Sequence, residues 1–370
     1  MNQKIKYLSF VFLVFLIIEI IAQLILLSFE SKKYSIILKP FSNQISKLTT
    51  NYIINWDYEK NKMKPGTYIT KEGIEYRINS NGFRGKEFNK IKNKKRIITF
   101  GGSTTIGLES PDEKTYPSQL EKLLSKNNYN YEVINMGFGS KSINYVKNLF
   151  FTEAYKYKPD VIIIYSNRNS LMYDGSFVEP KIINSNYLIK SNYFLQDNIM
   201  TYRLMFKIYK RLINLNLKSG YVRSPFSSKG VSENYLKYGY TDSLKEIIEF
   251  SEKNYIKVIL VKQAYYFKEN IFGFIEKYNN SELLEKYKQG FFKKNFNLDE
   301  EVIFWSLMGS ILNRNLDNLK IYNNVVVVDP ILNLVKEEDN FTDYLHLTPK
   351  GNFVLANEIL NQGLSIFENK

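Results

Sequence analysis

Short β-branched segments that alternate with helical segments constrain the fold of this chain most. Five apolar runs are each bounded by turn-forming residues: RIITF at 96–100, YEVINM at 131–136, DVIIIY at 160–165, KVILV at 257–261 and NVVVVD at 324–329. The run YEVINM is the weakest of them. Continuous apolar runs of this length are typical of strands buried on both faces, and therefore of a parallel sheet.

Helical patterns lie between these runs, at residues 116–126, 143–157, 242–254 and 350–367. Strands that alternate with helices predict a doubly wound α/β domain. We therefore expect a three-layer α/β/α sandwich of the flavodoxin-like type, with a central parallel sheet of about five strands. Residues 171–240 and 263–320 lack the alternation and are rich in Tyr, Phe, Asn and Lys. We interpret them as helical or irregular insertions over the carboxyl edge of the sheet.

The amino-terminal part differs in character. Leu8 to Phe29 is an apolar run of 22 residues that contains only Glu19 and Gln23 as strongly polar members. It is long enough to cross a hydrocarbon core of about 30 Å, and it exceeds the apolar core of a cleaved signal peptide. The prediction is an uncleaved transmembrane anchor at residues 1–30, with a buried core helix as the alternative.

The rest of the chain divides in two by composition. Residues 31–94 are polar and aromatic, with turn signals, and we expect a juxtamembrane segment whose short strands pack on the main domain. Residues 95–370 form that main domain, including both insertions. The lysines that flank the apolar run do not decide which side of the membrane the domain occupies.

Composition excludes several kinds of chemistry. The chain has no cysteine and one histidine, His346, which excludes thiolate catalysis, cysteine-bound metals and multi-histidine metal sites. No phosphate-binding or dinucleotide-binding glycine motif occurs, so no metal and no cofactor is expected. The formal net charge is +14, but the excess is scattered, which disfavours nucleic acid and favours an anionic membrane or envelope polymer as partner. The sequence does not indicate an oligomeric state.

Two glycine-rich turns follow the first two predicted strands. GGST at 101–104 places Ser103 where its own N–H can point toward an anion, and NMGFGSKS at 135–142 contains Gly137 and Gly139, which free the backbone to present N–H groups. Each turn taken alone has an ordinary explanation. Ser103 can cap a helix or line a phosphate-binding loop as well as act as a nucleophile.

Two more polar segments follow later strands. YSNRNS at 165–170 places the carboxamide of Asn169 at the same edge, where Asn is common for turn geometry alone. In DYLHLTPKGN at 343–352, Thr348 is expected to cap the last helix and Pro349 to begin it. Asp343 and His346 then lie in the loop just before that helix.

The four segments, in this order, resemble the four sequence blocks of the SGNH (GDSL-type) hydrolase family. The resemblance covers about residues 96–170 and 324–366, and the GGS variant together with NSNGFRG at 79–85 is similar to membrane-anchored bacterial branches. The third block departs from the family because Ser170 replaces a common acidic residue. In the second block, spacing places the backbone donor at Ser140 rather than at Gly139.

The resemblance implies a role for each residue. Ser103 would be the nucleophile, His346 the general base and Asp343 its orienting partner. The oxyanion hole would consist of the N–H groups of Ser103 and of Gly139 or Ser140, with the Asn169 side chain. Asp329, which ends the fifth run, is the other carboxylate at this edge, and we interpret it as a structural cap.

Three functions are compatible with these residues. The first is a membrane-anchored serine esterase or deacetylase that acts on acyl groups, mainly acetyl, of envelope glycans or on a small ester. The second is a glycan O-acyltransferase that uses the same triad, and the third is a non-catalytic binding protein on a degenerate hydrolase fold. The family context favours a domain on the outer, extracytoplasmic face of the membrane.

Overall fold

The structure is a computed structural model. It describes residues 3–29, 56–57, 62–70, 73–171, 174, 234–268, 271–296 and 300–368, with a few single residues between 195 and 208. Two compact units make up the chain: Met1–Lys64, Tyr68–Glu75 and Glu179–Arg223 in the first, and Pro65–Thr67, Tyr76–Val178 and Ser224–Lys370 in the second. Most of the predicted insertion at 171–240 lies outside the described residues.

The first unit contains helix α1 (Gln3–Phe29) and the paired strands β1 (Trp56–Asp57) and β2 (Lys62–Met63). Glu19 of α1 is buried, and its Oε2 accepts hydrogen bonds from the Thr201 N–H (2.9 Å) and hydroxyl (2.8 Å). Among the residues that the structure describes, no helix has both the length and the apolar character needed to cross a membrane. The membrane anchor at residues 1–30 stays a prediction.

A parallel five-stranded sheet forms the centre of the second unit, as the apolar runs predicted. Its strand order is β6-β5-β7-β8-β9, which is the 2-1-3-4-5 order of flavodoxin-like folds. The strands are β5 (Lys95–Gly101), β6 (Tyr131–Gly137), β7 (Val161–Tyr165), β8 (Lys257–Val261) and β9 (Val325–Val328). Each of the five predicted runs is one of these strands.

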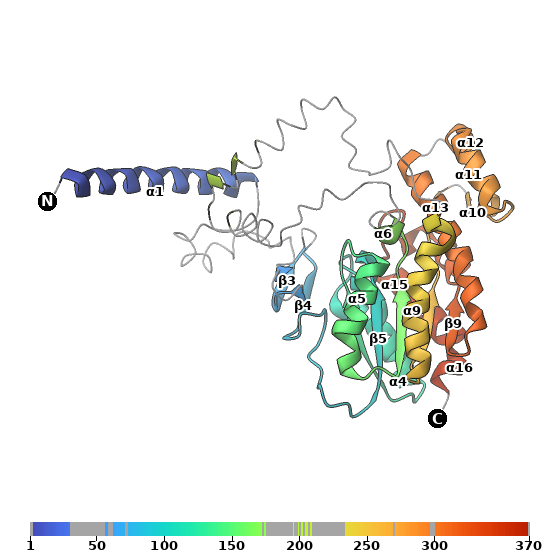
Figure 1. Cartoon of the computed structure of the whole chain (residues 1–370). Helices are drawn as coiled ribbons and strands as arrows, with labels where there is room; N and C mark the ends of the chain where they lie inside the picture. Colours follow the sequence, from blue (N-terminus) through green and yellow to red (C-terminus); the bar gives the residue numbers. More distant parts are fainter. Residues whose placement is uncertain are drawn as a thin grey trace. The chain divides into compact units, whose positions relative to one another are not determined.

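Helices cover both faces of the sheet (Figure 1). On one face α4 (Tyr116–Lys126) packs against α15 (Pro349–Gln362), and both share a buried cluster with Ile97 of β5. On the other face lie α5 (Ile143–Thr152) and α9 (Tyr240–Lys253), where Phe100 of β5 meets Phe150 of α5 at a ring distance of 6.2 Å. Successive side chains of a strand point to opposite faces of the sheet. Because helices cover both faces, the strand side chains on both faces must be apolar.

Two predicted helices are interrupted in the structure. The helix expected at 143–157 ends at Thr152, where Glu153 leaves the helical conformation, and continues as the 3-10 helix η3 (Ala154–Tyr157). The helix expected at 350–367 ends before Gly363 and is followed by the short helix α16 (Leu364–Phe367).

The segment at 263–320 contains helices α10 (Ile271–Ile275), α11 (Asn280–Lys288), α12 (Phe291–Phe296) and α13 (Glu300–Leu316). Helix α13 contacts α9 and leads through the 3-10 helix η6 (Asp317–Ile321) into β9, so it is the crossover helix between β8 and β9 rather than part of an insertion. The sequence did not reveal it because neighbouring side chains such as Phe304, Trp305 and Leu307 are all buried. A helix that is apolar around most of its circumference shows no amphipathic period.

Short strands precede the sheet, as the sequence predicted for the segment at 31–94. Strands β3 (Gly66–Ile69) and β4 (Glu75–Ile78) pair with each other. Residues 31–55 lie outside the described part of the chain. Residues Pro65–Thr67, and the segment from Tyr76 onward, belong to the compact unit that contains the sheet.

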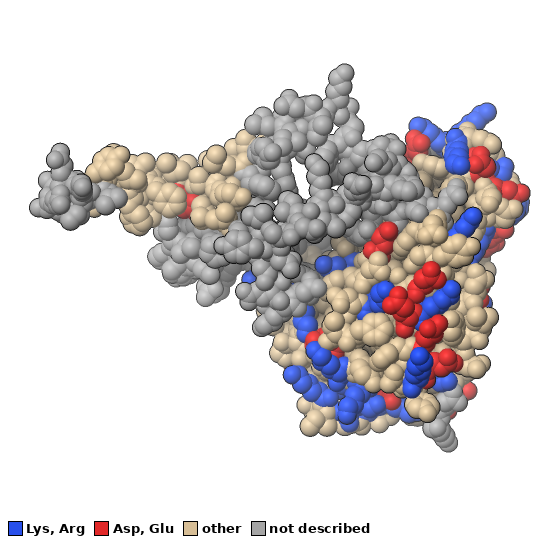
Figure 2. Space-filling view, in the orientation of Figure 1, with Lys and Arg blue, Asp and Glu red and all other residues tan. Residues whose placement is uncertain are grey.

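Figure 2 shows charges of both signs mixed over the middle of the sheet domain, and mainly Lys and Arg side chains along its lower edge. Lys147 of α5 pairs with Glu246 of α9 at 2.8 Å, and Lys245 pairs with Asp242 at 3.2 Å on the same helix. Ion pairs of this kind leave no dense basic surface over α5 and α9.

Candidate active site

The candidate nucleophile lies where the strand order of the sheet reverses. Strands β5 and β7 are neighbours in space, although β6 separates them in the sequence. Ser103 follows β5 as the first residue of the short helix α3 (Ser103–Ile106), and Asn169 lies in α6 (Arg168–Ser170), just after β7. The carboxyl ends of strands at such a switch point are where ligands bind in open α/β sheets.

Ser103, His346 and Asp343 form one hydrogen-bonded chain. The Ser103 Oγ lies 2.8 Å from His346 Nε2, and His346 Nδ1 lies 2.7 Å from Asp343 Oδ2. A carboxylate at Nδ1 keeps the ring proton on that nitrogen and leaves the lone pair of Nε2 toward the hydroxyl group. The structure thus brings together the three residues that the sequence predicted as a triad, in the order that nucleophilic catalysis requires.

A tight turn positions Asp343 and His346. Asp343 Oδ1 accepts the N–H groups of Leu345 and His346, both at 2.7 Å, while Oδ2 holds the imidazole. An isolated bridge between Phe341 and Leu347 closes the turn. Because Asp343 precedes His346 by only three positions, the turn itself brings the carboxylate to the ring without any distant contact.

The helix cap expected after this turn is present. The Thr348 side chain accepts the N–H of Gly351 at 3.2 Å, and Pro349 is the first residue of α15. The cap keeps the end of the turn in a fixed position, because it satisfies a donor that the helix cannot satisfy internally.

The carboxyl group of Asp343 is held ionised. Burial opposes ionisation, but the hydrogen bond and charge of His346, together with the N–H groups of His346 and Leu345, hold the pKa of Asp343 below its usual value. An ionised carboxylate stabilises an imidazolium when His346 takes a proton from the serine.

Two asparagines flank the candidate site, and their surroundings differ. Asn167 is buried: its Nδ2 donates to Gly309 O and Asn313 Oδ1, both at 2.9 Å, and its Oδ1 accepts the Tyr265 hydroxyl at 3.0 Å. The Asn169 side chain has no hydrogen bond to any residue that the structure describes. Its carboxamide could therefore bond to a substrate, and its place in an oxyanion hole stays a prediction.

Gly102 allows Asn169 to approach the nucleophile. A Cβ atom at Gly102 would lie 2.4 Å from Asn169 Nδ2 and 3.9 Å from the Lys141 carbonyl oxygen. Any other residue at 102 would displace the carboxamide from the start of α3. The close approach of Asn169 therefore explains why a glycine precedes Ser103.

The turn after β6 runs beside this point. Phe138 N–H donates to Gly101 O at 3.0 Å, Gly139 faces open space, and Ser140 has a positive φ of 59°. A backbone donor from Gly139 or Ser140 stays a prediction, because no contact joins either residue to Ser103 within the described structure.

Buried polar side chains from outside the triad hold α3 in place. Arg84 is 3% exposed; its Nη1 donates to the carbonyl groups of Ile106 (2.7 Å) and Gly107 (2.5 Å), and its Nη2 donates to Ser110 O (2.5 Å). Asn135 Nδ2 donates to Thr105 O at 3.0 Å. Arg84 lies in the segment NSNGFRG, whose sequence indicates a family resemblance but no role for any residue. Its role was missed because its acceptors are 22–26 residues away.

Two further sequence observations are accounted for. Ser170, which departs from the family pattern, accepts the N–H of Ile143 at 2.9 Å and so joins the third turn to the start of α5. Asp329 pairs with Lys262 at 2.9 Å and accepts the N–H of Ile331 at 3.2 Å, which agrees with its interpretation as a cap. Neither residue contacts the triad.

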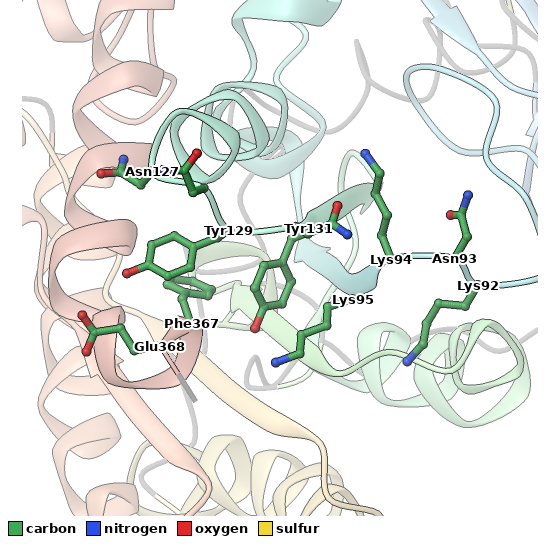
Figure 3. A pocket seen from close by; sticks show the side chains of 11 residues that line it. Lys92, Asn93, Lys94, Lys95, Asn127, Tyr129, Tyr131, Phe367 and Glu368 are labelled. Atoms are coloured by element: carbon green, nitrogen blue, oxygen red, sulfur yellow. The ribbon is translucent and has the colours of Figure 1, made fainter. Parts of the chain in front are cut away.

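A larger pocket of about 820 Å³ lies at the opposite end of the strands, around the first residues of β5 and β6. Figure 3 shows the rings of Tyr129, Tyr131 and Phe367 on one side and the lysines of 92–95 on the other. It contains no nucleophile paired with a base. The pocket that contains Ser103 and Asn169 is small, so pocket size does not identify the site here.

The described residues contain no group of three or more His, Cys, Asp or Glu side chains that could hold a metal ion.

No family model matches the chain, and no curated protein matches it. Several solved structures are similar to it. An acetylxylan esterase from Geobacillus stearothermophilus (a catalytic mutant) has a TM-score of 0.41 at 13% identity, covering 74% of this chain and 96% of its own. A GDSL-like lipase from Bacteroides thetaiotaomicron has a TM-score of 0.39 at 13% identity, covering 75% and 89%. A lipolytic protein of the G-D-S-L family from Desulfitobacterium hafniense has a TM-score of 0.41 at 12% identity, covering 72% and 98%.

Proposed function

We propose that this protein is a serine esterase of the SGNH type. The observation that carries the proposal is the continuous chain Ser103–His346–Asp343, with contacts of 2.8 and 2.7 Å, near the Asn169 carboxamide, which has no hydrogen bond to a described residue. Serine needs a base within hydrogen-bond reach to attack at neutral pH, and the base needs a partner that fixes its tautomer. The two contacts support the proposal that Ser103 and His346 have these roles.

The reaction follows from these positions. Ser103 Oγ attacks the ester carbonyl carbon while His346 Nε2 takes the hydroxyl proton, and the carbonyl oxygen becomes an oxyanion. The Ser103 N–H and Asn169 Nδ2 would donate to that oxygen, and one such donor is worth about 2.7–4 kcal/mol in the transition state. The imidazolium then protonates the leaving alcohol, which leaves an acyl group on Ser103.

Deacylation repeats these steps with a second acceptor. His346 takes a proton from water, the hydroxide attacks the acyl carbonyl, and the imidazolium returns the proton to Ser103 Oγ as the acid leaves. A sugar hydroxyl in place of water would give acyl transfer through the same residues. The proposed substrates are acyl groups, mainly acetyl, on envelope glycans or small esters.

Covalent labelling tests the proposal directly. A fluorophosphonate reacts only with a serine that a base activates, so the wild-type protein should gain one adduct, located by peptide mass at Ser103. Ser103→Ala should gain none, and Ser142→Ala, which changes a serine without a catalytic partner, should label like the wild type. An unlabelled, folded wild-type protein would support the non-catalytic alternative.

Product analysis separates hydrolysis from transfer. An acetylated oligosaccharide incubated with the enzyme should release free acetate at a rate that a second, unacetylated oligosaccharide does not change. Appearance of acetyl groups on that second oligosaccharide would identify an O-acyltransferase instead.

We further propose a membrane location for residues 1–30, on the support of the apolar run Leu8 to Phe29. The full-length protein should remain with membranes after a carbonate wash, and a variant that begins at residue 31 should be released. Protease added to intact spheroplasts should digest the main domain if it lies on the outer face. Resistance until lysis would place the domain inside.

A further inference from the structure

Arg168 lies beside the candidate nucleophile and is not used by the proposed reaction. It is the first residue of α6, between the buried Asn167 and the available Asn169. Arg168 is one of the residues that line the same small pocket as Ser103 and Leu345. A residue with a cationic side chain therefore borders the pocket that contains the candidate nucleophile.

Two aromatic rings hold the Arg168 side chain. Its guanidinium carbon lies 5.4 Å from the ring centre of Trp305 and 5.5 Å from that of Tyr344. Trp305 is fully buried. Contacts of this kind fix the direction of the guanidinium and remove water from its faces, but they supply no hydrogen-bond acceptor.

No described residue accepts a hydrogen bond from Arg168 or forms an ion pair with it, and its Nε is buried without a partner. The other arginines in the described part of the chain all have acceptors: Arg77, Arg84, Arg96 and Arg314. Arg96, for example, donates to Glu132, Tyr157 and Asn89. A buried N–H group of a guanidinium without an acceptor is unfavourable unless a ligand supplies one.

We propose that Arg168 binds an anionic group of the substrate, so that the site selects esters that carry a carboxylate near the scissile carbonyl. This inference rests on the proposed esterase function and specifies its substrate class. A planar guanidinium pairs with a carboxylate through two parallel hydrogen bonds. The formal charge of +14 would also draw anionic substrates toward the protein.

The test compares matched anionic and neutral esters. One arm uses the para-nitrophenyl monoester of succinic acid against para-nitrophenyl valerate, which places the charge on the acyl side. The other uses O-acetylated galacturonic acid against O-acetylated galactose, which places it on the alcohol side. In at least one arm, Arg168→Gln should lower the ratio of kcat/KM for the anionic ester to kcat/KM for the neutral ester by about 10- to 100-fold. This is the effect expected when one charge-assisted hydrogen-bonded contact is lost.

A matched control and a second variant accompany the test. Arg77→Gln removes an exposed arginine outside the pocket and should leave the ratio unchanged. Arg168→Lys keeps the charge but not the planar fork, and should give an intermediate ratio. An unchanged ratio in Arg168→Gln on both arms, or a wild-type enzyme with no preference for the anionic ester on either arm, would overturn the inference.

Binding separates this inference from the esterase proposal. By calorimetry, succinate should bind wild-type protein and Ser103→Ala alike, bind about 10- to 100-fold more weakly to Arg168→Gln, and bind more tightly than succinamide, its neutral diamide. Equal binding of succinate and succinamide to wild-type protein would overturn the role of Arg168 even if Ser103 proves catalytic. Loss of the serine mechanism with intact, Arg168-dependent succinate binding would overturn only the esterase proposal.

Discussion

At the amino ends of β5, β6 and β7 two pairs of charged side chains form ion pairs within the fold, whereas at the carboxyl ends of β5 and β7 two polar side chains have no hydrogen-bond partner among the described residues. Arg96 Nη2 contacts Glu132 at 2.6 Å, and Lys92 contacts Asp160 at 2.8 Å, beside the large pocket of Figure 3. At the other end, Asn169 and Arg168 have no acceptor or donor among the described residues. Groups left unpaired by the fold are available to a ligand, and this distinguishes the site better than volume does.

The largest expected effect comes from the triad. Ser103→Ala and His346→Gln should each lower kcat/KM for an aryl acetate on the order of 10⁶-fold, because nucleophile and base act as a unit. Circular dichroism should show an unchanged fold.

Variants at the other end of the sheet test whether the comparison holds. Lys94→Gln and Tyr129→Phe change residues of the large pocket and should leave kcat/KM unaltered. If they lowered activity as much as Ser103→Ala does, the chemistry would have been assigned to the wrong end.

The orienting carboxylate should matter less than the base. Asp343→Asn should lower kcat on the order of 10⁴-fold, because the amide favours the wrong ring tautomer while the oxyanion donors still function. Stopped assays at saturating ester measure this. Near-normal turnover in the folded variant would mean that the contact of 2.7 Å to His346 has no catalytic role.

The two asparagines provide a matched pair. Asn169→Ala should lower kcat about 10²- to 10³-fold with little change in stability, as expected for one oxyanion donor. Asn167→Ala should instead lower the free energy of unfolding by about 1–3 kcal/mol, because the groups that it bonds would be left unsatisfied. Urea unfolding and steady-state kinetics on both variants measure this contrast, and an exchange of the two phenotypes would reverse our assignment.

The smallest effect concerns stability and pH. The pKa of Asp343 is lowered in the folded protein from an ordinary value of 3.8, so the ionised group stabilises the fold at neutral pH. That contribution is lost as the pH falls through the lowered folded pKa. The side chain is 46% exposed, so solvent screening limits the effect to about 1 kcal/mol or less.

Unfolding experiments on wild type and Asp343→Asn check this. The difference in unfolding free energy should be constant above about pH 5 and shrink toward about pH 2. A difference that grew on acidification would contradict the direction of the shift.

Much of the fold could be predicted because its signals are local. Val161 to Tyr165 is apolar at every position, and a strand with that pattern has to be buried on both faces. The helix at 116–126 shows its polar and apolar faces, and the structure ends it at the same residues. Helix α13 was missed because it is buried on most sides, so its sequence lacks the alternation of polar and apolar faces on which helix prediction depends.

The sequence by itself determined the five strands, the polar turns that follow them and the pairing of Asp343 with His346, because each depends on neighbours a few residues away. Only the tertiary structure decided which groups at the site are free. Asn167 is occupied by partners 142 and 146 residues later in the chain, and Arg84 is buried against a helix 22 residues away. Arg168 is stacked on Trp305 and Tyr344 without an acceptor. Whether a donor is satisfied depends on what the fold brings to it, and no local pattern contains that information.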